Sequence, residues 1–153
     1  MIFYNIDIYK LMVYNKIMEI LLDASAIMAV IADEPESEIV INCTKDAIIV
    51  SPNMVSFEIV NGLTKMMKKR VIDTKEKMIT LIKNFERIPI KTVEADLKKS
   101  AEIAWDYKIY AYDAFYLEVA KRLNLPLLTF DGGMRRIGKE IGITVLGGKD
   151  AGI

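Results

Sequence analysis

Residues 19–31, Glu-Ile-Leu-Leu-Asp-Ala-Ser-Ala-Ile-Met-Ala-Val-Ile, place a short apolar run, an aspartate and a helix-like segment in direct succession. A near-continuous apolar run is typical of a strand buried on both faces, as in a parallel sheet. The same pattern predicts strands at residues 19–22, 47–50, 88–90, 127–130 and 143–146. Helical spacing of apolar residues predicts helices at 25–32, 36–44, 51–67, 73–85, 93–105, 113–123 and 134–141. The alternation predicts an α/β fold, a three-layer α/β/α sandwich with a parallel sheet of about five strands.

Two predicted boundaries depend on single residues. Ser51 and Pro52 are expected to begin a helix, as a capping serine and a proline at the first helical position. Pro89 lies inside a predicted strand, and a proline there favours an edge of the sheet.

The composition restricts the chemistry available to the chain. Its 153 residues, 52% of them apolar and 27% charged, suit one globular domain. The 21 basic and 21 acidic residues cancel, so a nucleic-acid partner would need a local basic patch. The single cysteine, Cys43, excludes an internal disulfide and a thiolate metal cage. The absence of histidine excludes histidine triads, imidazole bases and histidine metal sites, which leaves carboxylates, hydroxyls, amides, lysine and arginine for catalysis.

The ends of the sequence suggest how the domain is bounded. No uncharged apolar run approaches the roughly 18 residues that a membrane span needs, and residues 1–17 lack the pattern of a secretory signal. With one free cysteine, this favours the cytoplasm. We expect residues 18–147 to form the domain and residues 148–153 to be a tail. Residues 1–17 are expected to be an artefact of the assigned start, with Met18 the natural one; the alternative is an added element that packs on the sheet.

Four acidic residues stand out from this pattern. Asp23 and Asp131 each follow a predicted strand directly, and parallel sheets bind ligands beyond the carboxyl ends of their strands. Glu58 and Asp113 lie within apolar helical segments, where solvation explains an acid poorly. If the four carboxylates converge, their repulsion calls for a cation. Oxygen ligands alone favour Mg²⁺ or Mn²⁺ over Zn²⁺ or Cu²⁺, and Mg²⁺ commonly works on phosphate oxygens.

Each acid also has a purely structural interpretation. Asp23 is a suitable N-cap for the helix that follows it, and so is Asp113, although the tyrosine three positions later is not a capping-box partner. Asp131 precedes glycine and suits a turn. Glu58 would be neutralised by an ion pair with Lys65 on the same helix.

The order of these motifs is similar to that of a known family. The motifs are Leu22-Asp23-Ala24-Ser25-Ala26, Ser56-Phe57-Glu58-Ile59-Val60-Asn61-Gly62-Leu63, Tyr112-Asp113-Ala114-Phe115-Tyr116-Leu117 and Leu127-Leu128-Thr129-Phe130-Asp131. In this order they resemble the PIN domain, and most of all the VapC-type toxin nucleases, over about residues 18–147. The resemblance implies a Mg²⁺- or Mn²⁺-dependent endoribonuclease. Such proteins are usually homodimers that a small VapB-type antitoxin holds inactive.

The resemblance also assigns roles to residues. It implies an acidic catalytic metal site and two nearby hydroxyls that orient the carboxylates: Asp23, Glu58, Asp113 and Asp131, with Ser25 and Thr129. The chain departs from the family in two places. Residues 1–17 have no counterpart, and Gly-Gly-Met at 132–134 replaces a further acid that some relatives have, so a second metal would have fewer ligands.

RNA would need basic groups beside an acidic pocket. Candidates are Lys65 and Lys68, close to the basic run 68–70, and Arg135 and Arg136 after Asp131. For the lysines, a solvated helix end is the stronger alternative. The tyrosines at 107, 110 and 112 suit core or dimer packing better than base stacking.

Other protein classes fit less well. A haloacid-dehalogenase phosphatase requires a second aspartate at position 25, where the chain has serine. A receiver domain requires a phosphoacceptor aspartate after the third strand, where the chain has Lys91 and Thr92. Two alternatives stay open, a PIN ribonuclease of RNA processing or decay outside a toxin pair and a non-catalytic RNA- or antitoxin-binding module.

Overall fold

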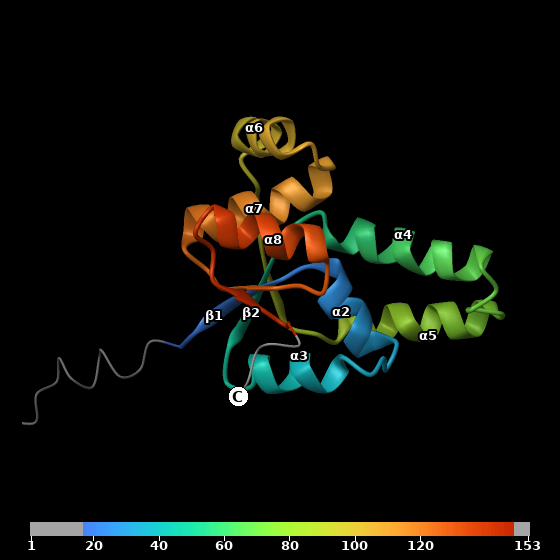
Figure 1. The fold of residues 1–153 in the computed structure, drawn as a ribbon. Coiled ribbons are helices and arrows are strands. Elements are labelled where there is room, and N and C mark those ends of the chain that lie inside the picture. Colours follow the sequence, from blue (N-terminus) through green and yellow to red (C-terminus); the bar gives the residue numbers. More distant parts are fainter. Residues whose placement is uncertain (1–16, 149–153) are drawn as a thin grey trace, which may run out of the picture.

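A five-stranded parallel sheet forms the centre of the computed structural model, which describes residues 17–148 (Figure 1). The strands are β1 (Glu19–Leu22), β2 (Ile48–Pro52), β3 (Ile90–Val93), β4 (Leu127–Leu128) and β5 (Val145–Leu146). The helices are α2 (Ala24–Ile31), α3 (Ser37–Thr44), α4 (Val55–Lys68), α5 (Lys75–Glu86), α6 (Leu97–Tyr107), α7 (Ala111–Leu123) and α8 (Gly132–Glu140). The predicted α/β/α architecture with a parallel sheet is therefore confirmed.

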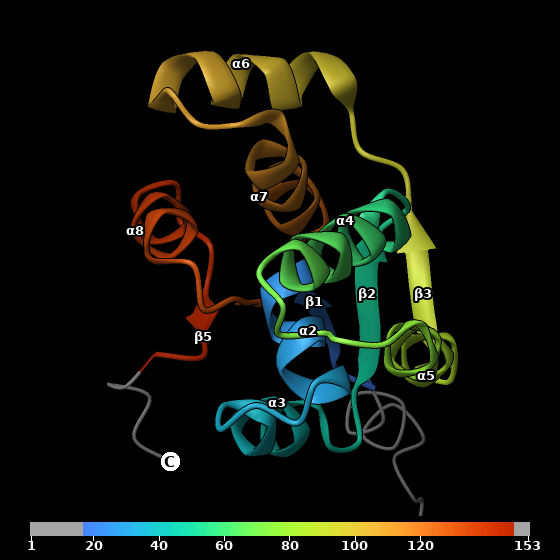
Figure 2. The same ribbon diagram turned by 90° about the vertical axis from the view of Figure 1, so that its right-hand side faces the viewer.

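The strand order β3-β2-β1-β4-β5 contains one reversal of direction. From β1 the chain proceeds through β2 to the β3 edge, then crosses back to the other side of β1 to form β4 and β5. Since crossovers between parallel strands are right-handed, this reversal places α2–α5 and α6–α8 on opposite faces. Figure 1 shows α7 and α8 above the strands and α3 below them, and Figure 2 shows the two groups from the side. The carboxyl ends of β1 and β4 thus flank the topological switch point, where such sheets bind ligands.

The core lies on both faces of the central strands. Leu21, Leu127 and Leu128 are fully buried, as expected for strands covered on both sides. From α4, Ile59 and Leu63 pack into the core one helical turn apart, which fixes the face that α4 turns to the sheet. No helix among residues 17–148 is long and apolar enough to cross a membrane. The expectations for the 1–17 extension and the 148–153 tail fall almost entirely outside the described residues.

The boundary predicted at Ser51 and Pro52 is wrong. Both residues belong to β2, because pairing with β3 continues through them, with Ser51 opposite Thr92 and Pro52 opposite Val93. The Ser51 hydroxyl donates a hydrogen bond to the Leu22 carbonyl at 2.9 Å instead of capping a helix. Strand β2 is therefore joined to β1 beside the position where β1 ends.

The strand expected at 88–90 occurs at Ile90–Val93, at an edge of the sheet as Pro89 predicted. The next helix begins at Leu97 rather than at Val93, because the Asp96 side chain caps it by accepting from the Lys99 N–H. Strands β4 and β5 are shorter than predicted, with two residues each.

The Ser51 bond gives a test of how the strand ends are held. Ser51→Ala is expected to lower the free energy of unfolding by about 1 kcal/mol, because a buried hydrogen bond is lost without a change in packing. Urea denaturation measures the change. The control is Ser56→Ala, since the Ser56 side chain makes no hydrogen bond to any of residues 17–148. Equal stability of Ser51→Ala and the wild type would contradict the role given to this bond.

Candidate active site

Asp23 is the buried centre of the acidic site. It follows β1 directly, is only 1% exposed, and caps α2 by accepting a hydrogen bond from the Ala26 N–H at 3.0 Å. The Ser25 hydroxyl donates to the same carboxylate at 2.7 Å, and the Thr129 hydroxyl does so at 2.6 Å. The capping role foreseen for Asp23 is thus real, but it occupies only part of the carboxylate.

The two hydroxyls are themselves oriented by backbone donors. The Phe130 N–H donates to the Ser25 Oγ at 3.2 Å, and the Asp131 N–H donates to the Thr129 Oγ1 at 3.0 Å. Each hydroxyl has a single proton, and with an N–H arriving at its oxygen, that proton is free for Asp23. This network, the Asp23 cradle (Asp23, Ser25 and Thr129), joins the carboxyl ends of β1 and β4 at the switch point.

Burial makes the charge on Asp23 costly. Desolvation raises its pKa to about 6, against the lowering effect of the hydrogen bonds from Thr129, Ala26 and Ser25. The negative charge of Glu58 adds to the rise. Asp23 therefore has three hydrogen-bond donors around it but no ion pair with a basic side chain of residues 17–148. A buried carboxylate with a raised pKa of this kind marks a functional site more often than a structural one.

Glu58 comes to the site from the first turn of α4. It accepts a hydrogen bond from the Tyr116 hydroxyl, with 2.7 Å between Tyr116 Oη and Glu58 Oε2. Burial and the charge of Glu58 raise the pKa of Tyr116, so this phenol remains a donor. Within residues 17–148 Glu58 forms no ion pair with Lys65, so the structural alternative left open by the sequence is not realised.

Asp113 and Asp131 complete the set from α7 and α8. Asp113 lies in the first turn of α7, half-buried, and is not its cap, because Tyr110 holds that position. Burial, then the charge of Asp131, then that of Glu58 raise the pKa of Asp113. Asp131 is exposed and caps α8, accepting from the Met134 N–H at 2.7 Å. The charge of Glu58 therefore acts on both Asp23 and Asp113, and that of Asp131 acts on Asp113, although Asp23 and Asp131 also cap helices.

A family model for the PIN domain matches residues 20–140 of this sequence, which spans all four acids. The chain belongs to the PIN domain family. No curated protein sequence matches it.

Solved structures share the PIN fold at low sequence identity. PAE2754 from Pyrobaculum aerophilum is 23% identical, with a TM-score of 0.59 over 84% of this chain and 90% of that one. VapBC2 from Rickettsia felis, solved bound to a DNA fragment from its promoter, is 17% identical, with a TM-score of 0.60 over 84% and 97%. VapC20 from Mycobacterium tuberculosis, a toxin that cleaves the sarcin-ricin loop, is 15% identical, with a TM-score of 0.57 over 78% and 95%.

The donor set of this PIN domain suits a hard divalent cation. Within residues 17–148 no three acidic, histidine or cysteine side chains lie close enough together to hold one ion jointly. Mg²⁺ usually keeps several waters and takes only one or two carboxylates directly, so it does not require three side chains that hold it jointly. The three donors on Asp23 also leave lone-pair capacity on its carboxylate. Oxygen donors and uncompensated negative charge both match Mg²⁺ or Mn²⁺.

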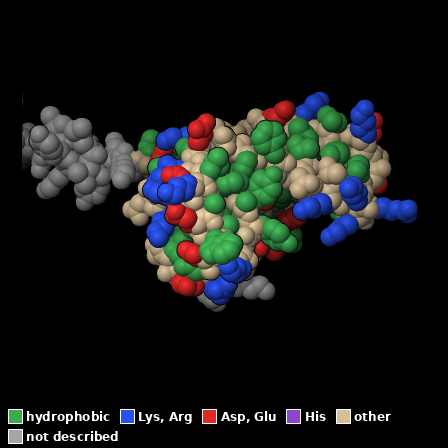
Figure 3. Space-filling view, turned by 90° about the horizontal axis from the view of Figure 1, so that it is seen from above, with side chains coloured by type: hydrophobic (Ala, Val, Ile, Leu, Met, Phe, Trp, Pro, Cys, Tyr) green, Lys and Arg blue, Asp and Glu red, His purple; other side chains and the backbone are tan. Residues whose placement is uncertain are grey.

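The basic residues predicted to contact RNA lie in different settings. Lys65 and Lys68 are exposed on the outer half of α4, and basic side chains gather at the free end of the α4–α5 hairpin (Figure 3). Arg135 turns toward β5 and donates to the Leu146 carbonyl at 3.4 Å. Arg136 is exposed and lies 3.8 Å from Glu140. The lysines and Arg136 are accessible, whereas Arg135 is partly engaged within the fold.

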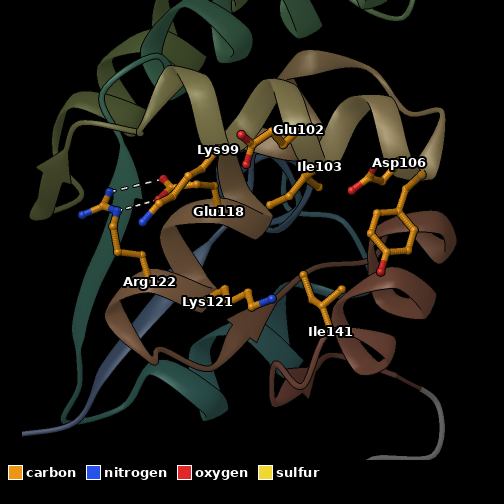
Figure 4. Close-up of a pocket in the computed structure, with 9 residues that line it drawn as sticks. Lys99, Glu102, Ile103, Asp106, Glu118, Lys121, Arg122 and Ile141 are labelled. Atoms are coloured by element: carbon orange, nitrogen blue, oxygen red, sulfur yellow. Dashed lines mark hydrogen bonds and ion pairs between the residues drawn. The ribbon is translucent and has the colours of Figure 1, made fainter.

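A cavity of about 620 Å³ lies between α6 and α7 (Figure 4). Of its lining residues on α7, Glu118 and Arg122 lie on the opposite side of that helix from Asp113 and Tyr116. Arg122 pairs with the buried Glu118 at 2.5 Å and donates to the Glu94 carbonyl at 2.7 Å. Glu118 also accepts from the Asp96 N–H at 3.0 Å, so this pair fixes the loop before α6 and takes no part in the acidic site.

Sequence reasoning missed Tyr116. It is fully buried on α7 and lies one turn beyond Asp113, on the same face of the helix. The available signal was a tyrosine one helical turn after Asp113, since a buried tyrosine hydroxyl needs a hydrogen-bond partner.

The raised pKa of Asp23 predicts a specific dependence of stability on pH. The folded chain holds this proton more tightly than the unfolded chain, whose pKa is near 3.8, so stability falls as pH rises through about 4 to 6. The loss is on the order of 3 kcal/mol, at about 1.4 kcal/mol per pKa unit. Urea denaturation in EDTA should show this decline in the wild type and a shallower one in Asp23→Asn. The exposed Asp106→Asn is the control, and an unchanged slope in Asp23→Asn would contradict the prediction.

The Tyr116 bond gives a second test. Tyr116→Phe is expected to lower the free energy of unfolding by about 1–2 kcal/mol, because a hydrogen bond to a charged group is lost while the ring remains. Tyr107→Phe removes a hydroxyl that makes no hydrogen bond within residues 17–148, and it should be nearly neutral. Chemical denaturation of both variants distinguishes the two cases, and equal losses would show that the Glu58 contact adds nothing.

Proposed function

We propose that the chain is a Mg²⁺- or Mn²⁺-dependent endoribonuclease that acts as the toxin of a VapBC-type toxin–antitoxin pair. The observation that carries the proposal is the Asp23 cradle at the switch point, with the charges of Glu58 and Asp131 close by. Membership of the PIN family and the structural likeness to VapBC2 and VapC20 support a nuclease of this kind.

The residues of the site have distinct roles in this proposal. The cation would lie among Asp23, Glu58, Asp113 and Asp131, bound directly by one or two of these carboxylates and through its own waters by the others. When bound, it would supply Lewis-acid activation of water and neutralise charge on the scissile phosphate. Ser25 and Thr129 keep Asp23 in place, and Tyr116 keeps the Glu58 carboxylate turned toward the site. Lys65, Lys68 and Arg136 would contact backbone phosphates outside the acidic centre.

We expect in-line attack by water on the phosphorus to break the bond to the 3′ oxygen, as in the family, which leaves a 3′-hydroxyl and a 5′-phosphate. Attack by the ribose 2′-hydroxyl would need a base and an acid of the kind that histidine provides, and the chain has no histidine. The ends of the products therefore distinguish the two routes.

The partners follow from the same proposal. A small VapB-type antitoxin would inhibit the enzyme, and a second copy of the chain would form a homodimer. Leu97 and Trp105 expose large apolar side chains along α6, a surface that a second copy would cover. The cytoplasm, where the RNA is, is the proposed compartment.

An RNA cleavage assay tests the proposal. The wild type should cut RNA with Mg²⁺ or Mn²⁺ and stop in EDTA. Asp23→Asn and Asp113→Asn should each lower the cleavage rate by more than about 100-fold. Substitution of a residue that only supports a metal ligand typically costs roughly 10–100-fold. Asp106→Asn is the matched control, because its carboxylate is exposed on α6. Full activity of either site variant removes that residue from the site, and 2′,3′-cyclic phosphate ends would refute hydrolysis by water.

A further inference from the structure

A second cavity, of about 330 Å³, lies beside the acidic site at the carboxyl ends of β2 and β3. Its lining comes from three segments: residues 52–54, residues 94–97 without Asp96, and Phe115 on α7. Most of this surface is apolar, with one aromatic ring, one amide and one carboxylate among the residues. Nothing in the site described above uses it.

The cavity is joined to the acidic site at three points. The Glu58 N–H donates to the carbonyl of Met54, a lining residue, at 3.2 Å. Pro52 follows Ser51, whose hydroxyl is bonded to the Leu22 carbonyl next to Asp23. Phe115 belongs to the same helix as Asp113, α7, although at two positions further its ring lies on the Glu118 side of that helix. Strands β1 and β2 are adjacent and parallel, about 5 Å apart, so the cavity and the acidic site lie at the same edge of the sheet.

The walls are fixed before any ligand arrives. The Asn53 N–H donates to the Val93 carbonyl at 2.9 Å, which joins two of the lining segments. The Glu94 carbonyl accepts a hydrogen bond from Arg122, and the neighbouring Asp96 N–H donates one to the buried Glu118. Figure 4 shows Glu118 and Arg122, which pair with each other. The Phe115 ring meets Tyr112 edge-on, with 6.2 Å between the ring centres. The Glu118–Arg122 pair thus holds one wall of this cavity rather than forming a site itself.

We propose that this cavity binds a nucleobase of the RNA next to the scissile phosphate and so gives the enzyme a base preference. The proposal rests on the proposed ribonuclease function. A base is flat and apolar on its faces, which suits stacking against Phe115, and carries donors and acceptors along its edge. Asn53 can both donate to and accept from such an edge, while the Glu94 carboxylate only accepts. An apolar side chain of a protein partner would contact the Phe115 ring but would make no hydrogen bond with Asn53 or Glu94.

Cleavage of short RNAs randomised around one cut site tests the proposal. With Mn²⁺, Phe115→Leu should lower the single-turnover rate about tenfold, as expected for the loss of one stacked base, and flatten the base preference at one position. Asn53→Ala should flatten the preference at the same position with a smaller loss of rate. The matched controls, Phe85→Leu and Asn84→Ala, lie near the end of α5, which precedes the amino end of β3, and should keep the wild-type preference.

A binding measurement separates this proposal from the ribonuclease proposal. The measurement uses the Asp23→Asn variant and a set of RNAs that carry the fluorescent base 2-aminopurine at successive positions. Binding should quench its fluorescence at one position, and adding Phe115→Leu should abolish that quenching. If the wild type does not cut RNA but this quenching is present, the ribonuclease proposal fails and the base site stands. If the wild type cuts RNA and both cavity variants keep its base preference, the base site is refuted, and a protein side chain becomes the better occupant.

Discussion

The Asp23 carboxylate, buried between two strands and held by three donors, is the constraint on which the rest of the site depends. Its neighbours Ser25 and Thr129 come from different strand ends, and each is held by a backbone N–H of the segment after β4. The network therefore sets how the ends of β1 and β4 lie against each other. Asp131 belongs to the same segment and caps α8, and its backbone N–H is bonded to Thr129, so the Asp23 cradle also fixes the position of Asp131.

The site is arranged at a cost to the stability of the empty fold. Burial and neighbouring negative charges act in the same direction on Asp23 and Asp113, and neither residue forms a salt bridge to a basic side chain of residues 17–148. Elsewhere the fold treats a buried acid differently, since Glu118 is paired with Arg122. Glu118 thus has a cationic partner of its own, whereas the two acids of the candidate site have none among the described residues.

Much of the fold could be predicted because its central strands are covered on both faces. The runs at 20–22 and 127–128 are apolar throughout, so they are recognisable without knowledge of their partners. The edge strand β3 contains the exposed Lys91 and Thr92, and its position was misjudged because one-sided burial leaves a weaker pattern.

At the site, the sequence and its family resemblance indicated the four acids and the two hydroxyls on Asp23, Ser25 and Thr129, but not the other contacts. Nothing local reveals that Ser51 bonds to the neighbouring strand or that Tyr116 meets Glu58, since these contacts join residues that are 29 and 58 positions apart along the chain. The contact between Thr129 and Asp23 spans 106 residues, and strand β1 pairs with β4 only after the chain has passed through β2 and β3. During synthesis, the acidic centre therefore cannot assemble until the ribosome has released the segment beyond β4. A nascent chain that still lacks this segment carries the Asp23 carboxylate without the Thr129 hydroxyl that holds it.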